Sequence, residues 1–494
     1  MIVSEWSRDL LFFARLSSPK RFLLWSSVTA VALHCVYVGN ASARYYYHHN
    51  ALYRNQAQSH LVLPKFTTPT SQTRLLVFAP HCDDDILGCA GIIRETLQAG
   101  GFVRVVTITN GDGFRTAVQQ QEKRFRVEPK DFVRFAEQRQ QESIAALENL
   151  GLEKKNIAFL GYPDRGLLAI WNDHWSPKQP FTSRYTRCTQ CPYPNAPRPS
   201  AVYCGESILE DVEAQLEAFR PTQVMVTHPS DDHGDHAAAA AFVQKAFRRV
   251  QQETRNRDWA ATANLSFYLI HRGEWPPKNS TTLLPPPEMA PLDTEWRSLV
   301  LSPAETTKKR TSLAFHSTQL AMSGGFLTSF VRSNEIFGEL KPFTVPVEES
   351  VQTRPDQKFG TVLLSPISDN LIRSLQGGGD IKAISAYRDA KQLHLKLEMR
   401  QSIARQIRYV VRLRAFDSKD HTTPRSITLF LNAVSALKAS GISKRIQGNT
   451  IELDIPLSRL ETRTGTLPQT IAISADTYLA SLEIDKTGIR FMDF

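Results

Sequence analysis

The feature that most constrains the fold is an alternation of strand and helix patterns that begins at Arg74 and continues to His271. Short apolar runs such as 74–79 and 102–109 predict buried strands, and the segment 86–101 between them has apolar residues at helical spacing. The same reasoning predicts strands at 156–162, 223–229 and 265–271 and helices at 131–152, 207–221 and 235–253. Such alternation is typical of a mostly parallel sheet with helices on both faces. We therefore predict an α/β, Rossmann-like fold.

A different pattern fills the last part of the chain. Segments such as 391–400 and 407–416 alternate apolar and polar residues at period two and are separated by turn-rich breaks. This pattern predicts an all-β, sandwich-like C-terminal domain, which would serve either glycan binding or packing. The expected domain order is an N-terminal signal or membrane anchor, a linker, the α/β domain, a second linker and the β-sandwich-like accessory domain, at 1–43, 44–72, 73–340, 341–356 and 357–494.

The N-terminus resembles an export segment. Basic residues from Arg8 to Arg21 precede the run 22–39, which contains no Asp, Glu, Lys or Arg, and Ala41-Ser42-Ala43 fits a small-x-small cleavage pattern. A cleaved signal and an uncleaved anchor both agree with this pattern. Either one predicts an extracytoplasmic protein with membrane or envelope association.

The net charge limits the class of binding partner, and the cysteine spacing limits the kinds of disulfide or metal site. The net charge of +10 favours an acidic partner, but no zinc-finger spacing, aromatic RNA-binding motif or dense basic tract is present, so we expect no nucleic acid. Cys188, Cys191 and Cys204 lie in one Pro-rich segment. They predict a disulfide or plain loop cysteines, because a zinc ribbon would need a fourth ligand that the segment does not offer.

Three predicted strands end in loops that carry reactive side chains: "PHCDDD" from Pro80, "TNGDGF" from Thr109 and "HPSDDHGDH" from His228. In open α/β sheets, ligands bind beyond the carboxyl ends of the strands. A single aspartate there is often a helix cap. Three in succession, Asp83, Asp84 and Asp85, would raise one another's pKa values unless a cation compensates. A divalent metal explains the run.

Histidine supplies the remaining donors. His81 and Asp84, three residues apart, can turn toward one point, and the third ligand must come from the loop that holds His228, His233 and His236, together with its aspartates 231, 232 and 235. His and Asp are normal zinc ligands, and a catalytic zinc usually keeps one position for water. The sequence therefore predicts one Zn²⁺ per active site.

These motifs resemble the PIG-L/LmbE-like superfamily of zinc-dependent N-acetylglucosaminyl deacetylases, whose motifs are Pro-His-Pro-Asp-Asp-Glu and His-x-Asp-His. "TNGD", "RQQESIAALENLG", "FLGYPDRGL" and "HSTQ" follow in the expected order, so the resemblance spans about 73–340. The resemblance implies metal ligands His81, Asp84 and His236, the general base Asp83, His233 acting on the amide and held by Asp235, and sugar contacts from Arg139 and Asp164. Cys82 and Asp85 depart from the family's Pro and Glu; we expect Cys82 to be a small buried filler.

The implied activity is removal of the acetyl group from an N-acetylglucosamine-type glycan, glycolipid or glycoside by metal-activated water. Two alternatives stay open: a divalent-metal glycosyltransferase, and a non-catalytic glycan-binding envelope protein. The aromatic segment between Asp164 and Cys204 predicts either a lid or sugar platform, or an inserted loop with its own small core. Trp171, Trp175, Tyr185 and Tyr193 are its aromatic residues.

Overall fold

The computed structural model describes residues 62–494, except 254–256, 278–279, 291, 349–357, 367–375 and 418–423, and short pieces between 26 and 50. The predicted signal or anchor and much of the first linker therefore lie largely outside the described residues. Within the described part, no helix is both long enough and apolar enough to cross a membrane.

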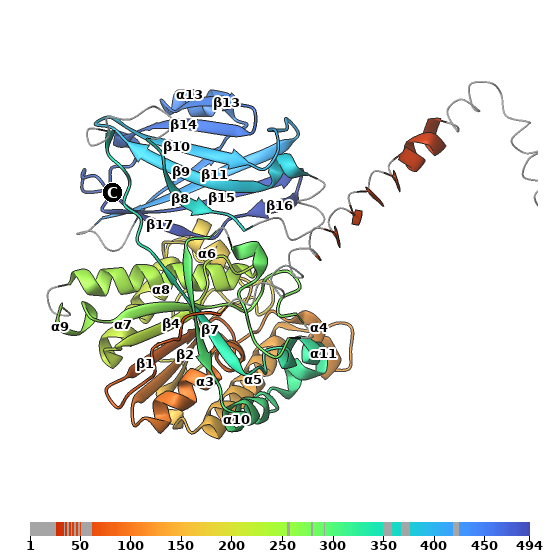
Figure 1. Ribbon diagram of the computed structural model, residues 1–494, viewed down its shortest axis with the longest axis vertical. Coiled ribbons are helices and arrows are strands. Elements are labelled where there is room, and N and C mark those ends of the chain that lie inside the picture. Colours follow the sequence, from red (N-terminus) through yellow and green to blue (C-terminus); the bar gives the residue numbers. More distant parts are fainter. Residues whose placement is uncertain are drawn as a thin grey trace, which may run out of the picture.

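A seven-stranded sheet forms the centre of the N-terminal part (Figure 1). Its strands are β1 (Arg74–Ala79), β2 (Phe102–Thr109), β3 (Ile157–Tyr162), β4 (Gln223–Thr227), β5 (Asn264–Tyr268), β6 (Thr294–Val300) and β7 (Asn334–Leu340). They lie in the order β3-β2-β1-β4-β5-β7-β6; the first five are parallel, and β7 and β6 add an antiparallel edge. The predicted Rossmann-like sheet is confirmed, whereas β6 and β7 were not predicted.

Helices cover both faces of this sheet, as the alternation of strand and helix predicts (Figure 1). On one face, α3 (Asp84–Gln98), α5 (Pro129–Leu150) and α10 (Pro303–Leu313) pack over Leu75 and Val77 of β1. On the other face, α7 (Gly205–Phe219) and α8 (Gly234–Gln252) pack over Leu76 and Phe78. Successive side chains of a strand point to opposite faces, so β1 contributes to both cores.

Shorter helices lie around the sheet: α4 (Arg115–Gln121), α6 (Leu167–Asp173), α9 (Arg257–Ala260) and α11 (Ser317–Thr328). The helix α5 ends as its sequence predicts. Gly151 follows its last residue with φ 102°, a left-handed conformation that glycine adopts without steric cost.

The C-terminal part consists of two antiparallel sheets, which confirms the predicted all-β architecture. Their strands are β8 (Gly360–Leu364), β9 (Ile381–Arg388), β10 (Gln392–Met399), β11 (Ile407–Phe416), β12 (Arg425–Phe430), β13 (Ser443–Gln447), β14 (Thr450–Pro456), β15 (Thr470–Leu479), β16 (Leu482–Lys486) and β17 (Arg490–Asp493), with the helix α13 (Val434–Ala439). One sheet has the order β13-β14-β10-β9-β8; the other has β12-β11-β15-β16, with β17 also on β15. Leu395 of the first sheet and Leu413 of the second share one apolar core. The domain boundaries themselves stay predictions.

The order of the large sheet also fixes where a ligand would bind. Chain connections run outward from β1 through β2 to β3 on one side and from β4 to β5 on the other. The loops after β1 and β4 therefore diverge at a topological switch point, which leaves a crevice at the carboxyl ends of these strands.

Candidate metal centre and active site

The loop between β1 and α3 brings His81 and Asp84 together. The His81 backbone N–H donates to Asp84 Oδ2 (2.9 Å), and His81 Nδ1 lies 3.2 Å from the same oxygen. Asp84 is the first residue of α3, so the turn from strand to helix sets this geometry.

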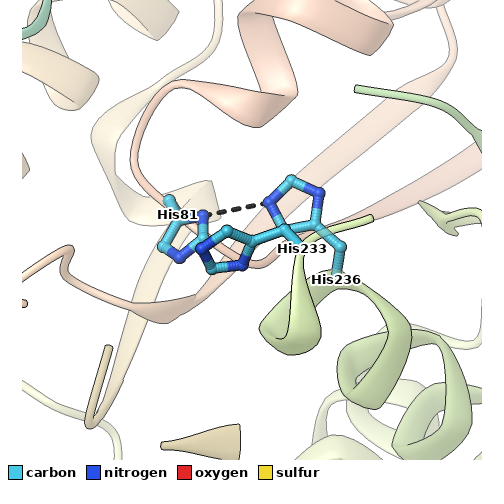
Figure 2. A group of neighbouring side chains, drawn as sticks. All are labelled: His81, His233 and His236. Atoms are coloured by element: carbon cyan, nitrogen blue, oxygen red, sulfur yellow. Dashed lines mark hydrogen bonds between the residues drawn. The ribbon is translucent and has the colours of Figure 1, made fainter. Parts of the chain in front are cut away.

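His236, in the first turn of α8, completes a group of three donors. Its Nε2 lies 3.1 Å from His81 Nδ1 (Figure 2) and 3.2 Å from Asp84 Oδ2. Ligand atoms about 2.0–2.1 Å from a tetrahedral zinc ion lie about 3.3–3.4 Å from one another. The three predicted ligands, all buried, thus have the spacing and the chemistry of a single zinc site.

Asp231 lies behind His236, a role that the sequence did not reveal. Its Oδ2 is 3.2 Å from His236 Nδ1 and accepts the backbone N–H groups of Ile270 and His271, while Oδ1 accepts the His233 N–H. Burial acts to raise the pKa of Asp231, but His236 and the backbone donors outweigh it and hold this pKa below its usual value. A carboxylate in this position orients a metal-binding imidazole. Its sequence signal is only an aspartate five residues before a histidine.

Asp83 and Arg139 form a buried pair beside the three donors. Arg139 Nη2 donates to Asp83 Oδ1 (3.2 Å), and Nη1 donates to the Gly111 carbonyl (3.3 Å). Gly111 has φ 70°, and a Cβ there would lie 1.6 Å from Arg139 Nη1, so the glycine of "TNGD" makes room for the guanidinium. The structure thus places Arg139 on the predicted base, and its sugar contact stays a prediction.

His233 caps the start of α8 and lies edge-on to His81, with ring centroids 4.9 Å apart (Figure 2). Its Nδ1 accepts the backbone N–H of Asp235 (3.3 Å), so the neutral ring carries its proton on Nε2. Burial, reinforced by His81 and His236, lowers the pKa of His233 and favours this neutral form.

The carboxylates of Asp235 and Asp164 accept backbone N–H groups of neighbouring loops, and the sugar contact of Asp164 stays a prediction. Asp235 accepts the N–H groups of Arg165 (2.5 Å) and Leu167 (2.9 Å), so it holds His233 through its backbone and not through its side chain. Asp164 lies 3.2 Å from His81 Nε2 and accepts the Gly113 N–H (2.9 Å). Both acids therefore orient the loops around His81.

A cavity of about 200 Å³ opens beside these groups. It is lined by His81, Asp83, Asp84, Leu87, Phe114, Arg139, Asp164, Arg165, His233, His271, Gln319, Ser323, Phe326 and Leu327. The volume is below the usual range for drug-sized ligands and is suited to a group of about one sugar ring. His271, which follows β5, was not predicted; its ring stacks on Phe326 with centroids 5.2 Å apart and lies 4.9 Å from that of His236.

Several residues of the predicted cluster lie apart from it. His228 Nε2 contacts Thr294 Oγ1 (3.0 Å), its ring stacks on Trp296, and burial lowers its pKa to about 3. Asp232 pairs with Arg272 (2.7 Å). Asp85 is fully buried, and neither of its carboxylate oxygens has a hydrogen-bond partner among the described residues.

The structure decides between the alternatives predicted for the cysteines. Cys188, Cys191 and Cys204 are free thiols, so the disulfide alternative is wrong and the plain loop alternative holds. Cys82 is fully buried beside Ile144 and Phe159, as expected for a small filler.

The aromatic segment after Asp164 is not a sugar platform built on its tryptophans. Trp171 and Trp175 are buried and contact Phe242 of α8 and Phe416 of β11, because the C-terminal sheets cover them. Tyr193 is also buried, and its hydroxyl donates to Asp112 (2.9 Å). Tyr185 is half-buried against Phe132.

Among the described residues, His81 also lies close to two other sets of potential metal donors: His233 with His236, and Asp164 with His233 and Asp235. A buried donor set with an adjacent carboxylate and a neutral imidazole, at the switch point of a doubly wound sheet, is the arrangement of a candidate metal-dependent α/β enzyme. Residues 76–247 match the family PIG-L, described as GlcNAc-PI de-N-acetylase, and this segment is a PIG-L family domain.

Solved structures with similar folds include three deacetylases. The A40926 pseudoaglycone deacetylase is 19% identical over 54% of this chain and 96% of its own, with a TM-score of 0.34. The N,N'-diacetylchitobiose deacetylase from Pyrococcus horikoshii is 16% identical over 55% of this chain and 85% of its own, with a TM-score of 0.35. Teicoplanin deacetylase Orf2, in a zinc-inhibited form, is 16% identical over 54% of this chain and 97% of its own, with a TM-score of 0.36. No protein with a curated description matches the sequence significantly.

Proposed function

We propose that this protein is a zinc-dependent N-deacetylase that removes the acetyl group from an N-acetylglucosamine-type amino sugar and releases acetate. The observation that carries the proposal is the convergence of His81, Asp84 and His236 within a PIG-L domain, with Asp83 and His233 beside them on the same cavity.

The zinc ion would be held by His81 Nδ1, Asp84 Oδ2 and His236 Nε2, which have the spacing of ligands around one ion. When bound, zinc lowers the pKa of a water molecule toward about 7 and polarises a carbonyl group. Asp231 fixes the orientation of the His236 ring, and Asp164 fixes that of His81.

Asp83 is the group placed to accept a proton from the attacking water. Its Oδ1 bonds to Arg139, which holds the carboxylate at the edge of the cavity, next to the ligand residue Asp84. After attack on the acetyl carbonyl, Asp83 would return this proton to the nitrogen as the C–N bond breaks, so that the amine leaves neutral. Water and the amide are thereby converted to acetate and a free amino sugar.

His233 acts on the oxygen of the acetyl group. Its proton lies on Nε2 because Nδ1 accepts the Asp235 N–H. A neutral N–H donor suits a developing oxyanion, since it stabilises the negative charge without consuming a proton. Removal of one such donor typically costs about 10²–10³ in kcat.

The substrate would place one N-acetylated ring in the cavity and extend outward from it. Asp164 and Arg139 line this space and are the proposed contacts for sugar hydroxyls. The family's description names a glycolipid, and the net charge of +10 and the apolar segment 22–39 favour an extracytoplasmic protein at a membrane or envelope. An N-acetylated glycolipid or envelope glycan is therefore the proposed substrate class.

An acetate-release assay tests the proposal. The purified full chain, stripped with chelator and reloaded with Zn²⁺, would be given N-acetylglucosaminyl-phosphatidylinositol, N,N'-diacetylchitobiose and N-acetylglucosamine. We expect acetate and free amine in equal amounts, only with metal, from at least one of them. Binding of these compounds without acetate release would favour a non-catalytic glycan-binding protein. Transfer from a nucleotide sugar that depends on Mg²⁺ or Mn²⁺ would favour a glycosyltransferase.

A further inference from the structure

The C-terminal sheets touch the candidate active site at two places outside the cavity. One contact is made by the turn between β16 and β17, which packs against the loop after β4. The other is made by β11, which holds the end of α6. Both β4 and α6 lead directly to residues of the site, so the contacts bear on its geometry.

The first contact is a close approach of two backbones. At Gly488, in the turn, a Cβ would lie 2.4 Å from the Pro229 carbonyl oxygen and 3.2 Å from Ser230 N. Real Cβ atoms do not approach so closely, so only glycine allows this contact without a shift of the backbone. Two small spaces of about 20 Å³ lie along this contact, each with room for about one water molecule.

The turn itself is fixed on its own sheet. Thr487 donates its backbone N–H to the Ala475 carbonyl (2.9 Å), and its Oγ1 accepts the Ala475 N–H (3.0 Å). Arg490, just after the turn, donates to Asp293 (2.6 Å) and to the Lys341 carbonyl (2.6 Å) of the α/β part. The turn is therefore a rigid support and not a loose loop.

The loop that it supports carries the site. From Pro229 and Ser230 the chain continues to Asp231, which orients His236, and to His233 at the start of α8. A displacement of the Pro229 peptide is transmitted along this loop, because Asp231 is tied to the loop by the His233 N–H and to β5 by the N–H groups of Ile270 and His271.

The second contact links β11 to α6. The buried Arg414 donates to the carbonyls of Trp171 and Asn172 (3.1 Å for the latter) at the C-terminal end of α6, and its guanidinium lies over the Trp175 ring (4.6 Å). At the other end of α6, Arg165 N and Leu167 N donate to Asp235. One short helix thus connects the β-sandwich-like part to an acid beside His81, since Asp235 Oδ2 lies 3.5 Å from His81 Nε2.

We propose that the C-terminal sheets are a positioning element of the active site. Through Gly488 and Arg414 they hold the loop 228–236 and α6 in the arrangement that forms the metal centre. Of the two roles expected for the C-terminal sheets, this proposal assigns packing against the active-site loops and not separate glycan binding. The inference rests on the proposed function for its effect on activity, but its effect on the loop does not require activity.

Gly488→Ala tests the first contact, and Gly378→Ala is the matched control. A Cβ on Gly378 would also meet a backbone oxygen, that of Ser402 at 2.5 Å, but this contact lies within the sandwich. Both changes therefore strain the same part of the chain, and only Gly488→Ala displaces the loop after β4.

In the Gly488→Ala variant, hydrogen exchange of the metal-free full chain should speed up in peptides covering 228–236. Its affinity for Zn²⁺ alone should fall by about 10- to 100-fold. The kcat should fall by about a hundredfold with KM within about twofold, because the proposed sugar contacts lie on other elements. In Gly378→Ala, only the melting temperature should fall.

Arg414→Met, with Arg408→Met on the same strand as its control, repeats the test if Gly488→Ala does not fold. Exchange should then increase in 165–173. If both site-directed variants keep the exchange, metal affinity and kcat of their controls, the inference is overturned. If they alter exchange and metal affinity in a parent chain that releases no acetate, the proposed deacetylase activity fails while the positioning role stands.

Discussion

Buried carboxylates serve opposite purposes in the two halves of this molecule. In the C-terminal sheets each is matched to local donors: Asp485 accepts the N–H groups of Ile381 and Lys486, and Asp417 accepts the hydroxyls of Thr462 and Thr464. Such acids fix a turn or a strand end, and they need no added ion.

At the carboxyl ends of β1 and β4, several acids instead gather around one group of imidazoles and lie close to one another. Asp83 and Asp84 are adjacent, and Asp164 and Asp235 both approach His81. Arg139 balances only part of this charge. The comparison shows that burial alone does not mark a functional acid; a better mark is a group of neighbouring donors with more acidic charge than the nearby cations balance.

The strongest test of this contrast removes one imidazole from each half. His236→Ala should abolish acetate release and weaken zinc binding by more than about a hundredfold, because a proposed direct ligand is lost. His394→Ala, which removes the bonds to Asp454 and Asp389 in the C-terminal sheets, should change stability alone. Zinc titration by calorimetry and an acetate assay measure both. Normal metal affinity in His236→Ala would disprove the assigned ligand set.

A second pair of variants compares two acids. Asp83→Asn should lower kcat by about 10²–10⁴, since it removes the proposed general base, and should leave zinc bound. Asp417→Asn should cost about 1 kcal/mol of stability through a weakened hydroxyl bond, with kcat unchanged. Steady-state kinetics with metal analysis of the same samples separates the two. An unchanged kcat in Asp83→Asn would assign the proton transfer to another group.

A third test addresses the apolar core of the sandwich. Leu395→Ala should destabilise the chain by about 2–5 kcal/mol, because it leaves a cavity between the sheets. Leu395 lies on the sheet that does not contain Gly488 or Arg414. Activity per folded molecule should therefore equal that of the parent, as denaturation followed by circular dichroism and an assay at low temperature would show.

A final test asks whether metal binding stabilises the C-terminal sheets as well as the α/β part. At a free zinc concentration of about 100 times Kd, the ion should stabilise the folded chain by about 2.7 kcal/mol. Because the two halves share buried contacts, calorimetry should show this shift in the unfolding of both. If the unfolding transition of the C-terminal sheets stayed at the same temperature after chelator was added, the two halves would unfold independently.

Much of this arrangement could be predicted because its signals are local. The strands from β1 to β5 are short apolar runs between helical patterns, and His81, Asp84 and His236 follow strand ends in loops rich in His and Asp. The choice of His236 among the neighbouring histidines came from the family resemblance and not from a local pattern. The partly exposed strand β6 lacks such a run, because it lies at the sheet edge.

The remaining features depend on contacts between distant segments. His271 is a single histidine after a strand, and nothing near it in sequence indicates its approach to His236. From the sequence, Trp171 in α6 and Trp175 just after it were equally compatible with a sugar platform and with a core. Only their partner, Phe416, which lies far along the chain, decides between these alternatives.

The packing of Trp171 and Trp175 against Phe416 also limits how this chain can be divided or recombined. A chain shortened after β7 would expose these rings and Phe242 to water as one contiguous apolar surface, which favours aggregation. Insertions and fusions should be tolerated at exposed loops such as the one around Gly465, whereas exchange of the C-terminal half for a foreign sandwich would require a matching aromatic face.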